Sequence, residues 1–495
     1  MSMHRNRQPV SGCIVGLIVG VFVFLGAAGA DELPPPVAQI MKRQGLATAG
    51  LSVYAHVIGA PRPFLSVGAD VPRNPASVLK LVTTLAALEE LGPAYQWKTE
   101  FYGSAPPRDG KLDGDLYLKG YGDPYLVIEQ FWRLVRGLRL SGLEQVTGDL
   151  VLDQSYFADE PGDPAEFDGQ PLRAYNVLPR ALLVNFQAVQ IRLLPQPRRL
   201  RVVADPPVPV DNQLKLIGGP CHGGGHRWSM QVRDGKQTRL LFSGNYAAAC
   251  GETELYRVLS DTGPYVHGIF RALWEEQGAR LKGGWREGAT PADATLLYTF
   301  KSPPLAEVVR LINKFSNNVM TRQLLLTLGA ERFGPPGTSA SGGRVVREWL
   351  QRRKLEFPEL VLDNGAGLSR EARISAHSLG RLLLAAYQSP YMPEFMSALP
   401  LSGQDGTLVN RFSGDLAGRL HLKTGSLNGV RALAGYVLDS AGRWVVIVSL
   451  YNDPRANSGA AEAAQRALVE WIYDRRTGDD GSPAPVATTE PDSKD

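Results

Sequence analysis

The amino-acid sequence predicts an α+β fold, in which an antiparallel sheet is flanked by helices and a large β-rich segment is inserted into the chain. Apolar residues recur at helical spacing from Val78 to Leu91 and again from Leu305 to Phe315. Three consecutive strand-like runs lie between Leu420 and Tyr451. Between the two helical stretches the chain contains short β-like runs with turn residues at close intervals. This separation of helices from strands is typical of the α+β class.

The first helix follows Asn74-Pro75-Ala76 and ends at Gly92-Pro93. Ser77 opens it, and the i,i+3 spacing places Lys80 one turn along on the same face. Because Lys80 lies within an apolar run, the pattern predicts a buried lysine next to the Ser77 hydroxyl. A desolvated lysine near another cation has a lowered pKa and can accept the serine proton. The alternative is that Ser77 is only a helix cap and Lys80 only a solvated lysine.

The second helical stretch has Ser302-Pro303 as its predicted N-cap and first residue. Ser316-Asn317-Asn318 follows its last apolar residue, and we expect this triplet to form a loop between helices. The alternative for the triplet is an ordinary polar connection without a chemical role.

The C-terminal part predicts an antiparallel meander. Lys423-Thr424-Gly425 closes a short strand that begins at Leu420, and Asn428-Gly429 supplies the hairpin turn. Two further strands are expected, from Val430 to Leu438 and from Trp444 to Tyr451. A helix from about Ser458 to Asp474 carries an apolar side that would cover one face of this sheet.

Three motifs therefore occur in a fixed order: S-x-x-K at Ser77, S-x-N at Ser316 and K-T-G at Lys423. With them the chain resembles the class C low-molecular-mass penicillin-binding proteins, which are D-alanyl-D-alanine carboxypeptidase/endopeptidases of the peptidase S13 type. The resemblance spans most of the chain and includes four further segments: 120–124, 175–185, 363–370 and 401–408. One departure is Ala366, where the family usually has a serine.

The resemblance implies a penicillin-recognising serine transpeptidase-like catalytic domain and a role for each motif residue. Ser77 is the expected nucleophile and Lys80 its base, while Ser316 would bridge Lys80 and Lys423 and relay a proton. Asn318 would bind a substrate amide. The peptide carboxylate would be held by Lys423, Thr424 and Ser426 around Gly425, and the third stem-peptide residue by four side chains: Asp153, Phe157, Arg370 and Asn428. The expected partners are peptidoglycan stem peptides and β-lactam antibiotics, with no cofactor and no metal.

The ends of the chain predict export to the periplasm or cell envelope. Residues 1–30 have the basic start, apolar run and A-x-A site of a signal peptide. The sequence leaves open whether this segment is cleaved or kept as an anchor that associates the protein peripherally with the membrane. Residues 476–495 have the composition of a disordered tail. Since the three motifs must meet in one site, we expect catalytic parts at 31–103 and 291–475, and inserted β-rich domains at 104–290.

Cys221 and Cys250 are the two cysteines that remain once the signal peptide is removed, and an oxidising compartment predicts that they form one disulfide. A zinc site with His222 and His226 is disfavoured, because the spacing lacks a paired C-x-x-C. The seven histidines include no H-E-x-x-H pair. A net charge of +4 is too small to indicate a nucleic-acid partner, and the oligomeric state is not predicted.

Two rival functions remain at this stage. A β-lactamase would share the three motifs, but it would have to hydrolyse its acyl-enzyme rapidly, and no deacylating glutamate loop is recognisable. A non-catalytic peptidoglycan-binding scaffold of the same fold would be expected to have lost at least one of Ser77, Lys80, Ser316 and Lys423.

Overall fold

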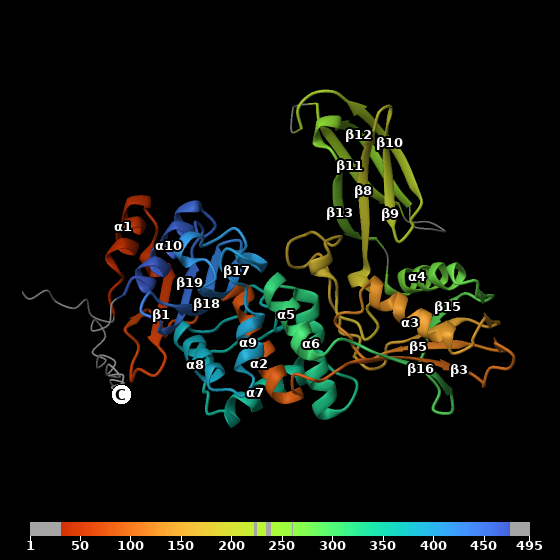
Figure 1. The fold of residues 1–495 in the computed structure, drawn as a ribbon, viewed down its shortest axis with the longest axis horizontal. Helices are drawn as coiled ribbons and strands as arrows, with labels where there is room; N and C mark the ends of the chain where they lie inside the picture. The colour runs from red at the N-terminus through yellow and green to blue at the C-terminus, as the bar shows by residue number, and fades with distance from the viewer. Residues whose placement is uncertain (1–30, 222–224, 234–238, 260, 476–495) are drawn as a thin grey trace, which may run out of the picture.

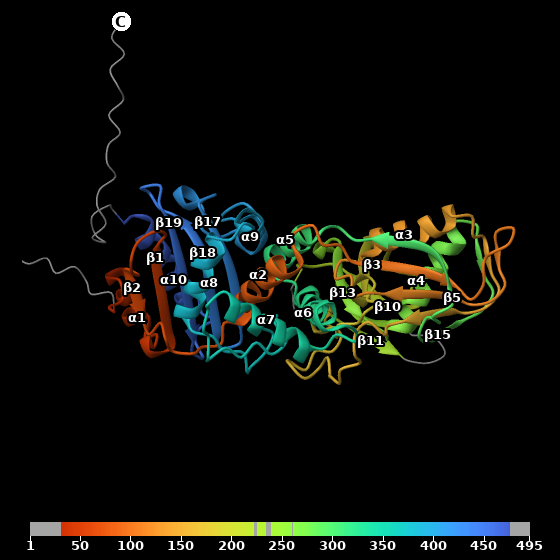
Figure 2. The same ribbon diagram turned by 90° about the horizontal axis from the view of Figure 1, so that it is seen from below.

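The computed structural model describes residues 31–221, 225–233, 239–259 and 261–475. The predicted signal peptide and tail lie outside these residues. The molecule is elongated, with one sheet and its helices at one end and the β-rich part at the other (Figures 1 and 2). None of the helices within the described ranges is long and apolar enough to span a membrane.

The first end of the molecule is built on a five-stranded sheet that joins both ends of the chain. Its strand order is β17-β18-β19-β1-β2, and β1 pairs antiparallel with β19. Figure 1 shows these two strands side by side in red and blue. The strands are β1 (Leu51–Val57), β2 (Leu65–Val67), β17 (Leu420–Leu427), β18 (Val430–Leu438) and β19 (Trp444–Asn452).

Helices cover both faces of this sheet, which explains why its inner strands are apolar without alternation. On one face Leu433 and Ile447 pack against α1 (Pro35–Gln44) and α10 (Gly459–Tyr473). On the other face Ala434 and Val448 belong to the larger core. That core is completed by α2 (Lys80–Leu91), α5 (Leu305–Phe315), α6 (Asn318–Phe333), α7 (Ser339–Arg352), α8 (Ala376–Tyr387) and α9 (Met392–Ala398).

The β-rich part contains a second five-stranded sheet, ordered β15-β7-β5-β3-β16. Its strands are β3 (Lys98–Gly103), β5 (Leu116–Gly120), β7 (Leu150–Asp153), β15 (Trp285–Glu287) and β16 (Thr295–Lys301). A small sheet lies next to it, made of β4 (Lys111–Leu112), β6 (Gln145–Val146) and β14 (Arg280–Leu281). Two amphipathic helices that the sequence reading did not anticipate, α3 (Ile128–Leu140) and α4 (Thr262–Glu276), complete its core.

Two three-stranded sheets extend from this part and share its core. They consist of β8 (Ala188–Gln196), β9 (Arg199–Asp205) and β13 (Thr253–Val258), and of β10 (Val210–Ile217), β11 (Arg227–Arg233) and β12 (Arg239–Ala247). Cys221 and Cys250 are joined by a disulfide, as the cysteine count predicts.

Strands β3 and β16 pair with each other and belong to the second sheet. This sheet therefore reaches beyond residues 104 and 290, the limits expected for the insertion. The division into domains stays a prediction.

One helix boundary was predicted wrongly. Helix α5 begins at Leu305 with Pro304 as its N-cap, so Ser302 does not cap it. The Ser302 hydroxyl instead accepts a hydrogen bond from the Trp97 backbone N–H at 3.0 Å, which ties the chain entering α5 to the chain entering β3.

Candidate active site

The S-x-x-K motif lies on a tight turn of the backbone. Ser77 is part of a short 3-10 helix, Ala76–Leu79, which leads directly into α2. Ala76 has a φ of 46°, a conformation that costs free energy for a residue with a Cβ. The Asn74 side chain supports it, because its Oδ1 accepts from the Ala76 N–H at 2.9 Å and its Nδ2 donates to the Ser369 carbonyl at 2.8 Å.

Lys80 is fully buried and makes three hydrogen bonds. Its Nζ donates to Ser77 Oγ at 2.9 Å, to Asn318 Oδ1 at 2.6 Å and to the Ala366 carbonyl at 2.6 Å. Burial, and then the charge of Lys423, lower the pKa of Lys80 well below that of a lysine in water.

The partners of Lys80 determine where its lone pair points once the amine is neutral. The Ala366 carbonyl and the Asn318 carbonyl oxygen can only accept, so they hold the two hydrogens that a neutral amine retains. The lone pair is then directed at the Ser77 hydroxyl. The geometry therefore suits transfer of a proton from Ser77 to Lys80.

Lys423 is the second buried lysine of the site. Its Nζ donates to Ser316 Oγ at 2.9 Å and to the Thr424 carbonyl at 2.8 Å, and burial lowers its pKa to about 7. Ser316 adopts a left-handed conformation at the C-terminus of α5, and Asn318 opens α6. The predicted bridge from Ser316 to Lys80 is absent from the hydrogen bonds of the described residues, where Asn318 takes that place.

Strand β17 passes directly against the nucleophile turn. A Cβ added to Gly425 would lie 2.7 Å from the Pro75 carbonyl oxygen and 3.1 Å from the Ser77 nitrogen. The third position of K-T-G must therefore be glycine for the strand to approach. Since β17 is an edge strand, its outer backbone groups face away from the sheet and can pair with an extended peptide.

Thr424 and Ser426 follow Lys423 on β17, and polar side chains from other loops contact their hydroxyl groups. Thr424 Oγ1 donates to Thr407 Oγ1 at 2.8 Å, and Asn457 Nδ2 donates to Ser426 Oγ at 3.2 Å. Thr407 lies in segment 401–408 of the resemblance, but the sequence did not indicate its contact with Thr424, and nothing marked Asn457, because each contact joins residues that are distant in the chain. Asn74 was also missed, although an Asn-Pro dipeptide is a turn signal.

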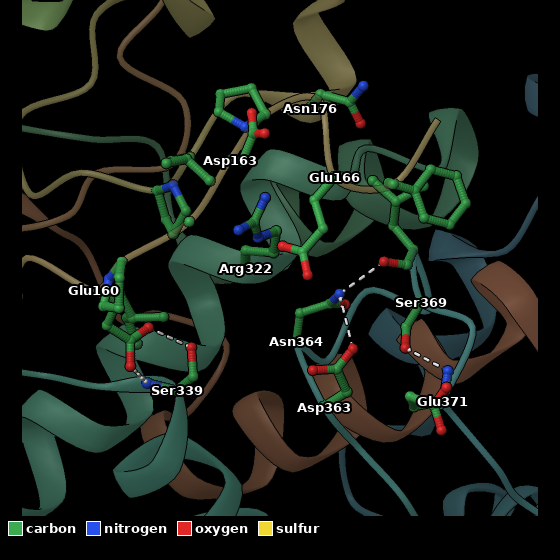
Figure 3. Close-up of a pocket in the computed structure, with 18 of the residues that line it drawn as sticks. Glu160, Asp163, Glu166, Asn176, Arg322, Ser339, Asp363, Asn364, Ser369 and Glu371 are labelled. Atoms are coloured by element: carbon green, nitrogen blue, oxygen red, sulfur yellow. Dashed lines mark hydrogen bonds between the residues drawn. The ribbon is translucent and has the colours of Figure 1, made fainter. Parts of the chain in front are cut away.

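Arg370 and Asn428 lie together beside the end of β17. Arg370 Nη1 donates to the Asn428 carbonyl at 2.9 Å, and its guanidinium lies 5.0 Å from the centre of the Phe167 ring. Arg370 lines a cavity of about 470 Å³. Figure 3 shows Glu166 and Arg322 extending into this cavity from opposite sides.

Asp153 and Phe157 are buried and line a different cavity, of about 260 Å³. The Asp153 carboxylate accepts from the backbone N–H groups of Ser155 and Thr290 and lies 3.3 Å from Lys119 Nζ. Burial raises its pKa, but hydrogen bonds from Ser155 and Thr290 outweigh burial and hold the pKa at about 2. Arg370 thus lies with Asn428 and Asp153 with Phe157, and the two cavities share Ala158 in their linings.

Comparison with known proteins identifies the family of the chain. The sequence model of the D-Ala-D-Ala carboxypeptidase 3 (S13) family matches residues 35–474. The chain belongs to this family. It is 30% identical to a D-alanyl-D-alanine carboxypeptidase of Actinomadura sp. over 413 residues, which are 80% of this chain and 76% of the relative. It is 24% identical to the carboxypeptidase DacB of Haemophilus influenzae, over 80% of this chain and 84% of the relative.

The solved structures agree with this S13 membership at the level of the fold. The structure of penicillin binding protein 4 from Haemophilus influenzae superposes with a TM-score of 0.74 at 22% identity, covering 89% of this chain and 99% of that one. A peptidoglycan endopeptidase of Bdellovibrio bacteriovorus superposes with a TM-score of 0.52 at 15% identity, covering 85% and 92%.

The contact of Lys80 with residue 366 accommodates Ala366, where the resemblance implies a serine. The group that contacts Lys80 is the backbone carbonyl of residue 366, and the Ala366 side chain is fully buried. A carbonyl is supplied by any residue, so the missing hydroxyl leaves this contact intact.

Proposed function

We propose that the protein is a serine D-Ala-D-Ala carboxypeptidase and endopeptidase that acts on peptidoglycan stem peptides through an acyl-enzyme on Ser77. The observation that carries the proposal is the 2.9 Å contact between Ser77 Oγ and a fully buried Lys80, whose hydrogen-bond partners among the described residues include no carboxylate. Family membership supports the same reaction.

Acylation begins with neutral Lys80. The Ser77 hydroxyl passes its proton to Lys80 Nζ while Oγ attacks the carbonyl carbon of the penultimate D-alanine. The negative oxygen that forms is stabilised by the backbone N–H groups of Ser77 and Ser426. Gly425, the neighbour of Ser426, packs against the Ser77 nitrogen.

The tetrahedral intermediate then releases the terminal D-alanine. Lys80 gives up the proton that it took from Ser77, and this proton reaches the leaving amine through the Ser316 hydroxyl, which Lys423 holds in place. Lys80 is neutral again after this step. Water later attacks the Ser77 ester, Lys80 accepts a proton from that water, and Ser77 Oγ recovers a proton as the peptide acid leaves.

Substrate binding uses the exposed side of β17. Lys423, Thr424 and Ser426 bind the terminal carboxylate, and the Asn318 amide nitrogen, left available by the contact of its oxygen with Lys80, binds a backbone carbonyl. Arg370 pairs with a carboxylate on the third stem residue, for which the cavity beside it has room. Asp153 and Phe157, which line the cavity that shares Ala158 with it, contribute to the same recognition, with Asp153 pairing with the ammonium group of that residue.

β-Lactams are expected to acylate the same serine. Their strained amide presents a carbonyl and a carboxylate like those of the natural substrate. One structure of the Haemophilus influenzae protein, 24% identical to this chain, is a complex with a β-lactam. We place the enzyme outside the cytoplasm, in the periplasm or cell envelope, on the basis of residues 1–30.

The test is Ser77→Ala. This variant should remain folded but lose both covalent labelling by a fluorescent penicillin and cleavage of a D-Ala-D-Ala peptide, because the hydroxyl is the atom that forms the ester. Persistent labelling of Ser77→Ala would refute the assignment of the nucleophile. In the wild type a short-lived label would favour the β-lactamase alternative, and absence of labelling with retained binding to peptidoglycan would favour the scaffold.

A further inference from the structure

The segment Leu401–Leu408 forms a wall of the catalytic centre that the three motifs do not include. The Asp405 carboxylate accepts two hydrogen bonds from Lys314 Nζ, at 2.8 and 2.6 Å. Gly406 packs on the backbone of α5, where an added Cβ would lie 2.6 Å from the Lys314 carbonyl oxygen. The segment is therefore fixed to the helix that ends at Ser316.

Thr407 is the residue of this segment that reaches β17. It is exposed, and its Oγ1 lies 2.8 Å from Thr424 Oγ1. The Thr424 hydroxyl is one of the groups that bind the substrate carboxylate in the proposed function, on which the present inference rests.

The number of hydrogen-bond donors at Thr424 and Thr407 defines the role of Thr407. In the unliganded site Thr424 donates its single hydroxyl hydrogen to Thr407. A carboxylate can only accept, so Thr424 must turn its hydrogen toward the ligand. The contact with Thr407 then persists only if Thr407 becomes the donor, which a hydroxyl group can do and an apolar side chain of the same shape cannot.

Ser426 has a partner of a different kind. Asn457 Oδ1 accepts a hydrogen bond from the Gly429 N–H at 2.8 Å, and Asn457 Nδ2 donates to Ser426 Oγ. The Ser426 hydrogen is consequently available in both states. The hydrogen bond whose direction reverses when the carboxylate binds is therefore the one between Thr407 and Thr424.

We propose that Thr407 is a positioning residue for the terminal carboxylate of the substrate, acting through reversal of its hydrogen bond with Thr424. It holds the Thr424 oxygen in place and, when the ligand is bound, donates to it and so polarises the Thr424 hydroxyl toward the carboxylate.

The experiment compares two ligands that differ in the carboxylate, benzylpenicillin and its methyl ester. Thr407→Val should lower the second-order rate of acylation by benzylpenicillin roughly three- to tenfold, the effect of one neutral hydrogen bond. Acylation by the ester should be unchanged. Thr407→Ser, the matched control, keeps the hydroxyl and should behave like the wild type with both ligands.

Peptide kinetics provide a second measurement. With a D-Ala-D-Ala peptide, Thr407→Val should raise KM by a similar factor with little change in kcat, because the lost interaction is made in the bound ground state and in the transition state alike. Equal losses with benzylpenicillin and its ester would show that Thr407 acts on the fold of the loop, and no loss with either would show that it has no role; both results overturn the inference. Failure of the wild type to react with any ligand would instead refute the proposed function.

Discussion

At the level of single residues, the chemistry depends on two lysines that are buried without acidic partners. The described hydrogen bonds of Lys80 and Lys423 all end on neutral oxygens. Water is excluded from both ammonium groups, so each lysine is easier to deprotonate than in solution, and the charge on one disfavours the charge on the other. One can then be neutral while the other is charged.

Lys80→Arg separates the role of a base from that of a structural cation. Arginine does not release its proton in proteins, so the variant keeps the charge and removes the base. Acylation by penicillin should fall by roughly 10²- to 10⁴-fold, the range for loss of a positioned acid-base group. Thermal unfolding must show that the variant is folded. A folded Lys80→Arg protein that acylates near the wild-type rate would exclude the mechanism.

The lowered pKa of Lys423 predicts that activity falls on the alkaline side of the pH profile. The rate kcat/KM should rise with pH as Lys80 loses its proton and fall above a pH of about 7, where Lys423 loses the charge that attracts the carboxylate. In Lys423→Arg the charge persists at every accessible pH, so the fall should move to higher pH, provided that the variant folds. A profile whose alkaline limb is the same in both proteins would assign that limb to another group.

The residue types of the site could be predicted from the sequence, but the contacts between these residues could be predicted only in part. S-x-x-K places Lys80 beside Ser77 because both lie on one helical turn, a local relation that the spacing determines. The contact of Lys80 with Asn318 joins segments far apart in the chain, and the sequence reading placed Ser316 there instead. The burial of Asp153 also depends on contacts between distant segments, because Thr290 and Lys119 come from separate strands and loops.

At the level of elements, the decisive contact is that of β17 with the turn before α2. The strand itself was predictable, because an Asn-Gly turn and three strand-like runs follow the K-T-G motif. The expected loop between helices implied a helix after 316–318, but not that α6 begins at Asn318 itself. Its buried side carries Thr321, Gln323 and Thr327 among the leucines and so blurs the apolar period. Asn318 is consequently the first residue of a helix, which orients it more firmly than a loop would.

Gly425→Ala tests the contact of β17. Its added Cβ would collide with the Pro75 carbonyl at 2.7 Å and push the strand away from Ser77. We expect acylation to fall by roughly 10²- to 10³-fold, as for loss of one oxyanion donor, with a small change in the thermal midpoint. Gly459→Ala is a useful comparison, because no atom lies within 4 Å of a Cβ added there and its φ is not positive. Similar acylation by Gly425→Ala and the wild type would contradict the argument.

At the level of the whole molecule, the two ends are joined where the β-rich part meets α6. The Gln323 side chain on α6 donates to the Asp123 carbonyl at 3.1 Å, and Asp123 lies three residues beyond the end of β5. The Asp123 carboxyl is buried, and its Oδ2 has no hydrogen-bond partner among the described residues. Burial raises the pKa of Asp123 to about 7, despite the hydrogen bond from the Tyr125 N–H.

Asp123 therefore makes stability depend on pH. Its folded-state pKa lies above its unfolded value, so the folded protein holds a proton that the unfolded chain releases, and stability declines as pH rises from about 4 to about 7. Above that range the cost of burying the charge is at most about 4 kcal/mol. Asp123→Asn should raise the thermal midpoint at pH 8 and leave it unchanged at pH 5. An equal change of the thermal midpoint at pH 5 and at pH 8 would show that the Asp123 carboxyl has the same charge at both pH values.

The order of the strands in the first sheet has a consequence for how the chain acquires its structure. Strands β1 and β2 are made early, whereas β19, the neighbour of β1 on its other side, is among the last segments to be synthesised. During vectorial synthesis one edge of β1 stays unpaired while hundreds of residues are added, and such edges are prone to aggregation. The nucleophile turn lies just beyond β2, so a nascent or truncated chain exposes Ser77 long before Lys423 arrives. A chain that ends before Lys423 therefore lacks part of the catalytic set.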